Sequence, residues 1–234
     1  MSPTSFFNFS FMPKYYTMFL QGLVYTLLLS VCAVLIAVIP AMLLAVCRLS
    51  KIKIIKFLSG LYIDIFRSTP LLVQLSLIYF GIFTAINLPT TYIFGFVNLA
   101  MFIPGVLALS LNSSAYVAEI FRAGILAVDA GQTEAARSLG LSSSATMFKV
   151  VLPQAIKNVL PAIANEVITM VKESSICSML GMMELMWAAK TVAATTYITI
   201  GPYIVAALIY FCINYPASKA IEAIERRMRR GDKR

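Results

Sequence analysis

The sequence predicts an all-α membrane protein with about five transmembrane helices, and its composition and apolar stretches carry that prediction. Hydrophobic residues make up 60% of the 234 residues, charged residues make up 12%, and the mean hydropathy is +0.86. A membrane span needs about 20 mostly apolar residues. After loops are subtracted, the length allows five or six helices in one domain. We therefore expect no fused soluble binding domain or ATPase domain.

The net charge of +9 does not indicate nucleic-acid binding, because the basic residues cluster beside apolar stretches. Of the 19 Lys and Arg, seven follow Ser218 and four lie between Arg48 and Lys56. Basic loops resist translocation and stay in the cytoplasm, so these clusters indicate membrane topology. The sequence has no histidine and no CxxC pair among its four cysteines. We expect no metal site, no disulfide framework and no cofactor in this chain.

The first predicted span runs from about Phe19 to Val46. Residues 1–18 are aromatic and polar, and no basic region precedes a short apolar core, so we interpret them as an extracellular or interfacial segment. The basic residues between Arg48 and Lys56 flank the other end of the span. The amino terminus is therefore expected outside the cell.

The second predicted span runs from about Leu71 to Ile86, and Pro70 is well placed to open its helix. Arg67 and Asp64 precede this span at its expected cytoplasmic edge. The following loop, to about Asn98, contains no Lys or Arg. This asymmetry supports the same orientation.

The third predicted span, from about Met101 to Val128, is too polar for a helix that faces only lipid. Asn112, Glu119 and Arg122 fall near one helical face. Glu119 and Arg122 are three residues apart and could pair. The pair can be read as a structural ion pair near the cytoplasmic end or as part of a gate together with Arg67.

A polar stretch from Glu134 to Pro153 separates the third and fourth spans. Thr133 could cap a short helix beginning at Glu134, and Gly140 suits a left-handed helix stop. Ser142 to Ser144 offer hydroxyl caps for a second short helix. We expect these two helices to form a compact surface knob that a soluble partner can bind.

The fourth and fifth predicted spans run from about Val150 to Val171 and from about Val192 to Pro216, followed by a basic tail. The expected organisation is a transmembrane domain over residues 19–216, with a cytoplasmic loop at 129–153 and a cytoplasmic tail at 217–234. An odd number of spans takes an outside start to an inside end.

Two carboxylates in or at the end of the fourth span are candidates for binding a cation. Glu166 and Glu173 are seven residues, or about two helical turns, apart and therefore share one face. Ionisable groups in a membrane are costly and usually face a cavity or the bundle interior. The ammonium group of an amino acid or a basic side chain would suit this pair. The alternative is that Glu173 pairs with Lys172 or Lys190 and that Glu166 bonds across helices.

The central stretch, EAARSLGLSSSATMFKVVLP, resembles the EAA loop of permease subunits in bacterial ATP-binding-cassette (ABC) importers. The residues that match this loop are Glu134, Ala135, Ala136, Gly140, Leu152 and Pro153, and Val150 stands where the family usually has Ile. In the family this loop docks on the ATP-hydrolysing subunit. The resemblance implies that Glu134, Ala135, Ala136, Gly140 and Leu141 couple the chain to a separate ATPase.

Further stretches resemble the polar amino-acid permeases, which include histidine, arginine, glutamine, glutamate and cystine importers. These stretches are GLVYTLLLS (22–30), FRSTPLLVQ (66–74), LNSSAYVAEIFRAGI (111–125), VKESSICSMLGMMEL (171–185) and ERR (225–227). The resemblance implies a type I ABC importer permease fold in a bacterial cell membrane, with Glu166 and Glu173 in the substrate site. Gln74 and Asn112 are plausible polar liners. The family often has Asp where this chain has Glu173.

The resemblance also implies partners and a mechanism of alternating access. The partners would be a second permease copy or a close relative, two ATPase subunits that bind ATP and Mg²⁺, and an extracellular solute-binding protein. The chain has no GxxxxGK[ST] phosphate loop, so we do not expect it to hydrolyse ATP.

Other classes remain open on the residues alone. Glu119, Glu166 and Glu173 could be the ion ligands of an ion-coupled carrier or channel, but that reading leaves the polar central stretch unexplained. An intramembrane enzyme is disfavoured because His-based triads, HExxH and GxSxG are all absent from the sequence. The sequence does not choose the amino acid, or between a homodimer and a heterodimer, and another small polar solute is possible.

Overall fold

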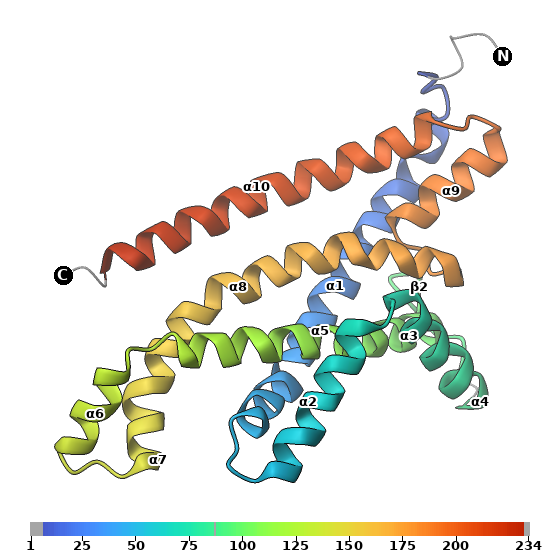
Figure 1. Ribbon diagram of the computed structural model, residues 1–234. Coiled ribbons are helices and arrows are strands. Elements are labelled where there is room, and N and C mark those ends of the chain that lie inside the picture. Colours follow the sequence, from blue (N-terminus) through green and yellow to red (C-terminus); the bar gives the residue numbers. More distant parts are fainter. Residues whose placement is uncertain (1–6, 87, 232–234) are drawn as a thin grey trace.

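The computed structural model describes residues 7–86 and 88–231, with side chains as far as Met228. Its helices, labelled in Figure 1, are α1 (Met12–Arg48), α2 (Lys53–Ser68), α3 (Leu71–Ile78), α4 (Thr84–Ile86), α5 (Leu99–Leu126), α6 (Ala130–Ser138), α7 (Ser143–Thr146), α8 (Leu152–Glu173), α9 (Leu185–Thr196) and α10 (Gly201–Gly231). Two π-helical turns, η2 (Tyr79–Phe83) and η3 (Met147–Val151), and a 3₁₀ helix, η4 (Ser174–Leu180), connect some of them. A short antiparallel hairpin, β1 (Tyr92–Ile93) and β2 (Val97–Asn98), precedes α5.

Three helices, α1, α5 and α10, are each long and apolar enough to cross a membrane. Two bent pairs would raise the number to five if each crosses as one span. The first pair joins Lys53–Ser68 to Leu71–Ile86 with a bend of 108°, and the second joins Ser143–Leu180 to Leu185–Thr196 with a bend of 46°. The predicted all-α architecture of about five spans fits this range.

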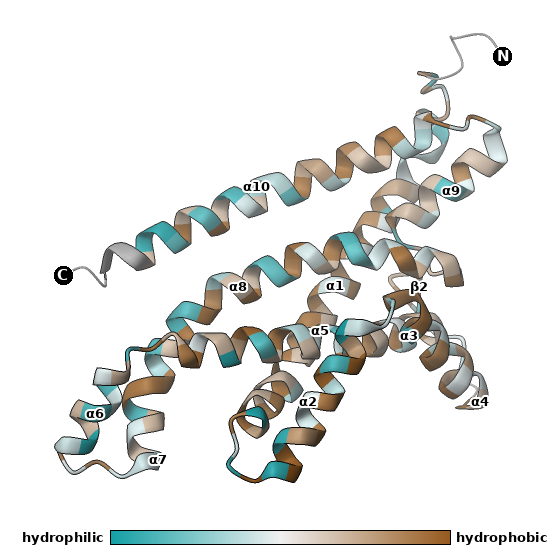
Figure 2. Ribbon diagram, viewed as in Figure 1, coloured by the Kyte–Doolittle hydropathy of each residue, from teal (hydrophilic) through white to brown (hydrophobic). Residues whose placement is uncertain are grey.

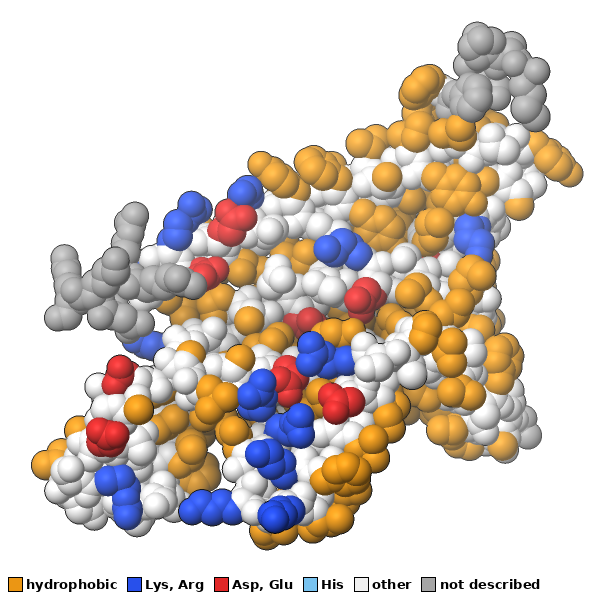
Figure 3. Space-filling view, in the orientation of Figure 1, with side chains coloured by type: hydrophobic (Ala, Val, Ile, Leu, Met, Phe, Trp, Pro, Cys, Tyr) orange, Lys and Arg blue, Asp and Glu red, His pale blue; other side chains and the backbone are white. Residues whose placement is uncertain are grey.

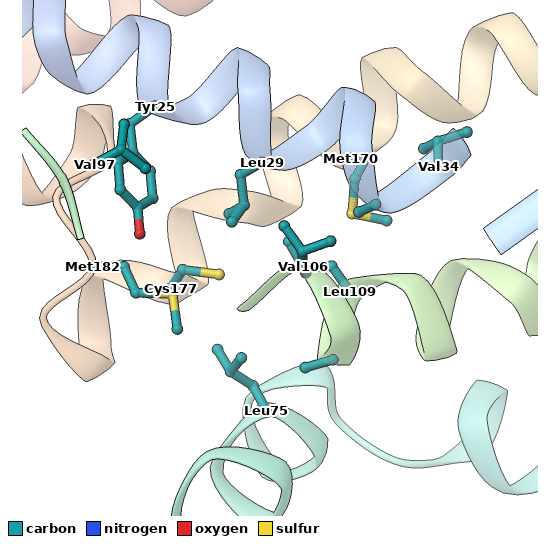
Figure 4. Packing of buried hydrophobic residues seen from close by; sticks show 12 residues of the cluster. Tyr25, Leu29, Val34, Leu75, Val97, Val106, Leu109, Met170, Cys177 and Met182 are labelled. Atoms are coloured by element: carbon teal, nitrogen blue, oxygen red, sulfur yellow. The ribbon is translucent and has the colours of Figure 1, made fainter. Parts of the chain in front are cut away.

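α1 and α5 form the centre of the bundle. Small residues recur every fourth position along α1 and are buried: Ala33, Ala37, Ala41 and Ala45. Residues four apart lie on one helical face, and alanines there let a second backbone approach closely. Larger side chains complete the core where α1, α3, α5, α8 and η4 meet, as Figure 4 shows for Leu29, Leu75, Leu109, Met170 and Cys177.

α10 is far less covered than the other long helices, since only 6% of its most apolar window is buried against the rest of the chain, compared with 61% for α5. Its first half is apolar and its last half is polar, a change visible along the helix in Figure 2. Exposed apolar side chains such as Leu208 and Phe211 suit contact with lipid tails or with another protein chain.

Several boundaries differ from the sequence-based expectation. α1 begins at Met12 rather than near Phe19, because Pro13 at its first turn costs no helical hydrogen bond. The predicted fifth span is wrong as one helix, since Tyr197 takes a left-handed conformation that ends α9 and α10 begins afresh at Gly201. α10 then passes residue 216 without a break, so the basic tail continues its helix.

Candidate functional site

The central polar stretch folds into two short helices, α6 and α7, which project from the bundle at the end where α5 finishes and α8 begins (Figure 1). The predicted start of α6 was wrong. Asp129, not Thr133, caps the helix, because its Oδ1 accepts a hydrogen bond from the backbone N–H of Gly131 at 2.7 Å. The helix therefore begins four residues earlier than Glu134, at Ala130.

The predicted turn at Gly140 is confirmed. Gly140 has φ +84°, and the backbone N–H of Leu141 reaches back to the carbonyl of Ala136 at 3.1 Å. A side chain at Gly140 would meet nothing within 4 Å, so the backbone conformation, and not crowding, selects glycine. Ser142 then caps α7 through its hydroxyl oxygen, as predicted, accepting from Ala145 N–H at 3.1 Å.

The knob formed by residues 129–146 offers an exposed surface. Glu134, Ala135 and Gly140 are exposed, Leu141 is half-buried, and Ala136 is buried at 5% exposure. Leu139, which is not among the predicted contact residues, is 84% exposed at the turn. An apolar side chain held this far into solvent is a typical contact residue for a partner.

A π-helical turn, η3, joins the knob to α8. Pro153 is the second residue of α8 and has no backbone N–H to donate to a carbonyl one turn earlier. The neighbouring Gln154 adds a side-chain hydrogen bond at this junction, because its amide donates to the Val150 carbonyl at 3.0 Å. The motif proline therefore lies where the knob passes into a membrane-spanning helix, and π-turns often occur at functional sites.

Glu166 is half-buried on α8 and faces α5, where the buried Ser113 hydroxyl donates a hydrogen bond to its Oε1 at 2.9 Å. Glu173 is also half-buried, at the end of α8. The helical path from Glu166 to Glu173 is unbroken, so the two carboxylates share one face as expected. The contact to Ser113 corresponds to the cross-helix bond that the sequence analysis weighed as an alternative for Glu166.

Gln74 and Asn112 lie in a different place from the carboxylates. Asn112 donates to Gln74 Oε1 at 2.8 Å, and Gln74 Nε2 donates to the Phe66 carbonyl at 2.8 Å and to the Thr69 carbonyl at 3.0 Å. Both side chains are buried. They supply partners for carbonyls that the broken α2–α3 segment leaves without helical donors. Their polar atoms are thus engaged in holding the 108° bend.

Glu119 and Arg122 form the predicted ion pair, with Arg122 Nη2 at 2.8 Å from Glu119 Oε2. The pair lies in the last two turns of α5, toward the knob. Arg67, at the end of α2, places its guanidinium 5.4 Å from the centre of the Tyr116 ring on α5. These charged groups therefore gather on one side of α5, between the α2–α3 bend and the knob.

Glu184, whose side chain is fully buried, is not among the predicted site residues. Its two oxygens cap α9, accepting from Trp187 N–H at 2.7 Å and Met186 N–H at 2.8 Å. Tyr210 on α10 donates to the same carboxylate at 3.1 Å, and Thr26 on α1 accepts from Leu185 N–H at 3.1 Å. An acidic residue directly before an apolar helical stretch was the signal available in the sequence.

The comparisons with known proteins fit this arrangement. Residues 33–230 match the family described as binding-protein-dependent transport system inner membrane component. The chain belongs to this family. It is therefore the permease subunit of an ABC importer, not an enzyme, and ATP hydrolysis lies in a separate subunit. The family also implies a solute-binding protein as partner and the inner membrane of a bacterium as location.

Individual relatives cover nearly the whole permease. A putative glutamine transport system permease protein of Rickettsia felis is 41% identical over 223 residues, which are 94% of this chain and 98% of the relative. An arginine transport system permease protein of Bacillus subtilis is 39% identical over 213 residues, with 91% of this chain and 93% of the relative covered.

Two solved structures share the fold of the permease. A crystal structure of an amino acid ABC transporter with histidines matches with a TM-score of 0.84 and 47% identity, covering 94% of this chain and 98% of that chain. An inward-facing methionine ABC transporter matches with a TM-score of 0.64 at 17% identity, covering 89% and 97%, and shows the fold alone. This chain therefore has the type I ABC importer permease fold.

Proposed function

We propose that this permease imports a polar amino acid by alternating access. The support comes from relatives whose names specify glutamine or arginine transport and from a related structure of an amino acid ABC transporter with histidines. Every amino acid carries an ammonium group, and a carboxylate in the membrane is the natural partner for it.

The proposal rests mainly on the environment of the Glu166 carboxylate. Glu166 is only half-buried, and one oxygen takes a hydrogen bond from Ser113, which leaves acceptor capacity on the carboxylate for a cation. Glu173, two turns along the same face, adds a second negative charge where α8 ends. The ammonium or a basic side chain of the substrate would bind between them. Gln74 and Asn112 support this site by holding the α2–α3 bend.

Coupling to the ATPase would use the exposed side of the knob, with Glu134, Ala135, Gly140, Leu141 and the protruding Leu139. ATP and Mg²⁺ would bind in the partner ATPase. Closure of the ATPase dimer would move the knob, and η3 would transmit that motion to α8 and its carboxylates. The Glu119–Arg122 pair with Arg67 would gate the cytoplasmic end of the path.

The orientation follows from the charges. Basic side chains gather around the start of α2, the knob and the last turns of α10, whereas the opposite end in Figure 3 is mostly hydrophobic. Loops rich in Lys and Arg stay in the cytoplasm. We place the knob and the α10 end inside, and the amino terminus, the β-hairpin and the α9–α10 turn outside.

A second permease copy, or a paralogue, would complete the path. A groove of about 770 Å³ runs between α8 and α10, and Asn158, Asn165, Ser218 and Glu222 are among its lining residues. Asn158 and Asn165 are exposed on α8, which we treat as membrane-spanning. Polar side chains at that depth avoid lipid and face protein or water. Two ATPase subunits would then bind the two knobs.

The test is ATPase activity of the complete complex, reconstituted in lipid nanodiscs with its ATPase and solute-binding protein, across a panel of amino acids. We expect stimulation by one chemical class of amino acid. Glu166→Gln and Glu173→Gln should each impair uptake without impairing assembly, while Asp64→Asn, at an exposed position on α2, should transport normally. Normal uptake by both membrane variants would sink the substrate-site proposal, and a complex that assembles but responds to no amino acid would sink the substrate class.

A further inference from the structure

Two exposed aromatic residues have a left-handed backbone conformation, which aromatic residues rarely adopt. Among the described residues, positive φ angles occur at Gly95, Gly140 and Gly181 and at two non-glycine positions, Phe94 (φ 54°) and Tyr197 (φ 57°). Left-handed backbone is costly for residues with a Cβ, and the bulky ones are rarest there. Both side chains nevertheless point into open surroundings, since Phe94 is 74% exposed and Tyr197 is 90% exposed.

Local structure explains the positive φ angles but not the aromatic side chains. Phe94 lies at the tip of the β1–β2 hairpin, where Phe96 N–H bonds the Ile93 carbonyl at 3.3 Å and Gly95 is also left-handed. Such tight turns favour Asn and Gly. Tyr197 ends α9 at a position that favours the same two residues. At each site the chain uses an aromatic residue against the local preference, and such violations are expected at functional sites.

Both residues lie at the end of the permease away from the knob. The hairpin precedes the first turn of α5, whereas the knob follows the last turn. The α9–α10 turn follows the far end of α8, and both features are at the right-hand side of Figure 1. In the proposed orientation this end faces the outside of the cell, so the inference rests on the proposed function.

The two chain segments that carry these residues are uncharged. Residues 88–98 and 191–203 contain no Lys, Arg, Asp or Glu. A partner that binds these two segments would be recognised by apolar and hydrogen-bonding contacts. Aromatic side chains are enriched at the centres of protein interfaces, where a few of them supply most of the binding energy.

We propose that Phe94 and Tyr197 are docking residues for the extracellular solute-binding protein. Each aromatic side chain inserts into an uncharged recess of that partner, and burial there offsets the unfavourable backbone and exposure in the free permease. Anchoring in the membrane interface, another use of aromatic residues, does not require a left-handed backbone. Tyr92 on the same hairpin is 52% exposed and has no positive φ. An aromatic anchor in the membrane interface can therefore use ordinary strand backbone.

The proposal is tested with Phe94→Asn and Tyr197→Asn, because asparagine suits left-handed backbone and the variants should fold at least as well as the wild type. The permease–ATPase complex is placed in nanodiscs, and binding of the solute-binding protein encoded beside it is titrated directly. We expect each variant to weaken this binding about thirtyfold or more, the size of an interface hot spot. Its thermal unfolding midpoint should be unchanged or raised, and its basal ATPase rate unchanged.

The control is Ile224→Asn, which removes an exposed apolar side chain at the cytoplasmic end of α10. It should bind the solute-binding protein like the wild type. Unchanged affinity in both aromatic variants would overturn the proposal, and a fall in thermal midpoint with unchanged affinity would assign the residues to membrane anchoring instead. Direct binding needs no transported amino acid, so a wild-type complex that binds this protein but responds to no amino acid would leave docking supported and reject only the substrate class.

Discussion

Tyr210 on α10 donates a hydrogen bond of 3.1 Å to Glu184, a fully buried carboxylate at the start of α9. Glu184 at the same time caps α9, and the neighbouring Leu185 N–H bonds Thr26 on α1. Gly22 permits this meeting, since a Cβ there would lie 3.0 Å from Leu185 Cα. Glu184 and the adjacent Leu185 N–H thus join three helices at the proposed outer end of the permease.

Loss of this carboxylate should cost much more stability than loss of its tyrosine partner. Tyr210→Phe removes one hydrogen bond and should lower the free energy of unfolding by about 1 kcal/mol. Glu184→Ala leaves two backbone donors and a tyrosine hydroxyl unpaired in the interior, and should cost about 3 kcal/mol or more. Thermal unfolding of the purified permease in detergent checks the order. Equal midpoints for the two variants would contradict this role of Glu184.

Gly140→Ala should weaken binding of the ATPase to the knob. Alanine at φ +84° costs about 1 to 2 kcal/mol, so the turn between α6 and α7 should shift to another conformation. The expected result is reduced co-purification of the ATPase. Gly81→Ala is the matched control, because a side chain at Gly81 also meets nothing within 4 Å but its φ is not positive. Normal ATPase binding by Gly140→Ala would show that the knob does not need this turn.

Gly124→Ala should disturb the packing of α5 on α8. An added Cβ would clash with Val159 Cγ2 and lie 3.3 Å from the Ala155 carbonyl. Overpacking of this kind typically costs about 1 to 3 kcal/mol. Val159→Ala should make room, so the double variant should be less destabilised than the two single effects added together. Thermal midpoints of all four proteins measure this coupling, and simple additivity would argue against the contact.

Ser113→Ala should change substrate affinity without preventing assembly. The substitution removes the 2.9 Å hydrogen bond to Glu166 and lets the carboxylate change rotamer. We expect about a tenfold rise in the KM for uptake, of the size given by one charge-assisted hydrogen bond (about 1.5 kcal/mol). Ser110→Ala is a suitable control, because that buried hydroxyl bonds only its own helix at the Val106 carbonyl. An unchanged KM in Ser113→Ala would remove Ser113 from the site.

The sequence by itself determined the features that depend on local chemistry. Apolar length gave the all-α architecture and the range of spans, because a bilayer demands about 20 apolar residues in each. The left-handed Gly140, the Ser142 cap and the Glu119–Arg122 pair were also predictable, since each involves residues no more than five positions apart. Fixed spacing in the central loop was enough to indicate the family.

Only the tertiary structure decided features that depend on residues far apart in the chain. Gln74 and Asn112 were predicted as polar liners, and only the fold shows that they bond each other across α3 and α5 and hold the α2–α3 bend. Glu184 was not predicted as a structural residue, because its partner Tyr210 comes from α10 and Thr26, which bonds the neighbouring Leu185, comes from α1. The division of the fifth span at Tyr197 was missed because tyrosine seldom takes a left-handed backbone. In each case the local structure depends on distant partners or on backbone strain, and the spacing of residues in the sequence does not encode either.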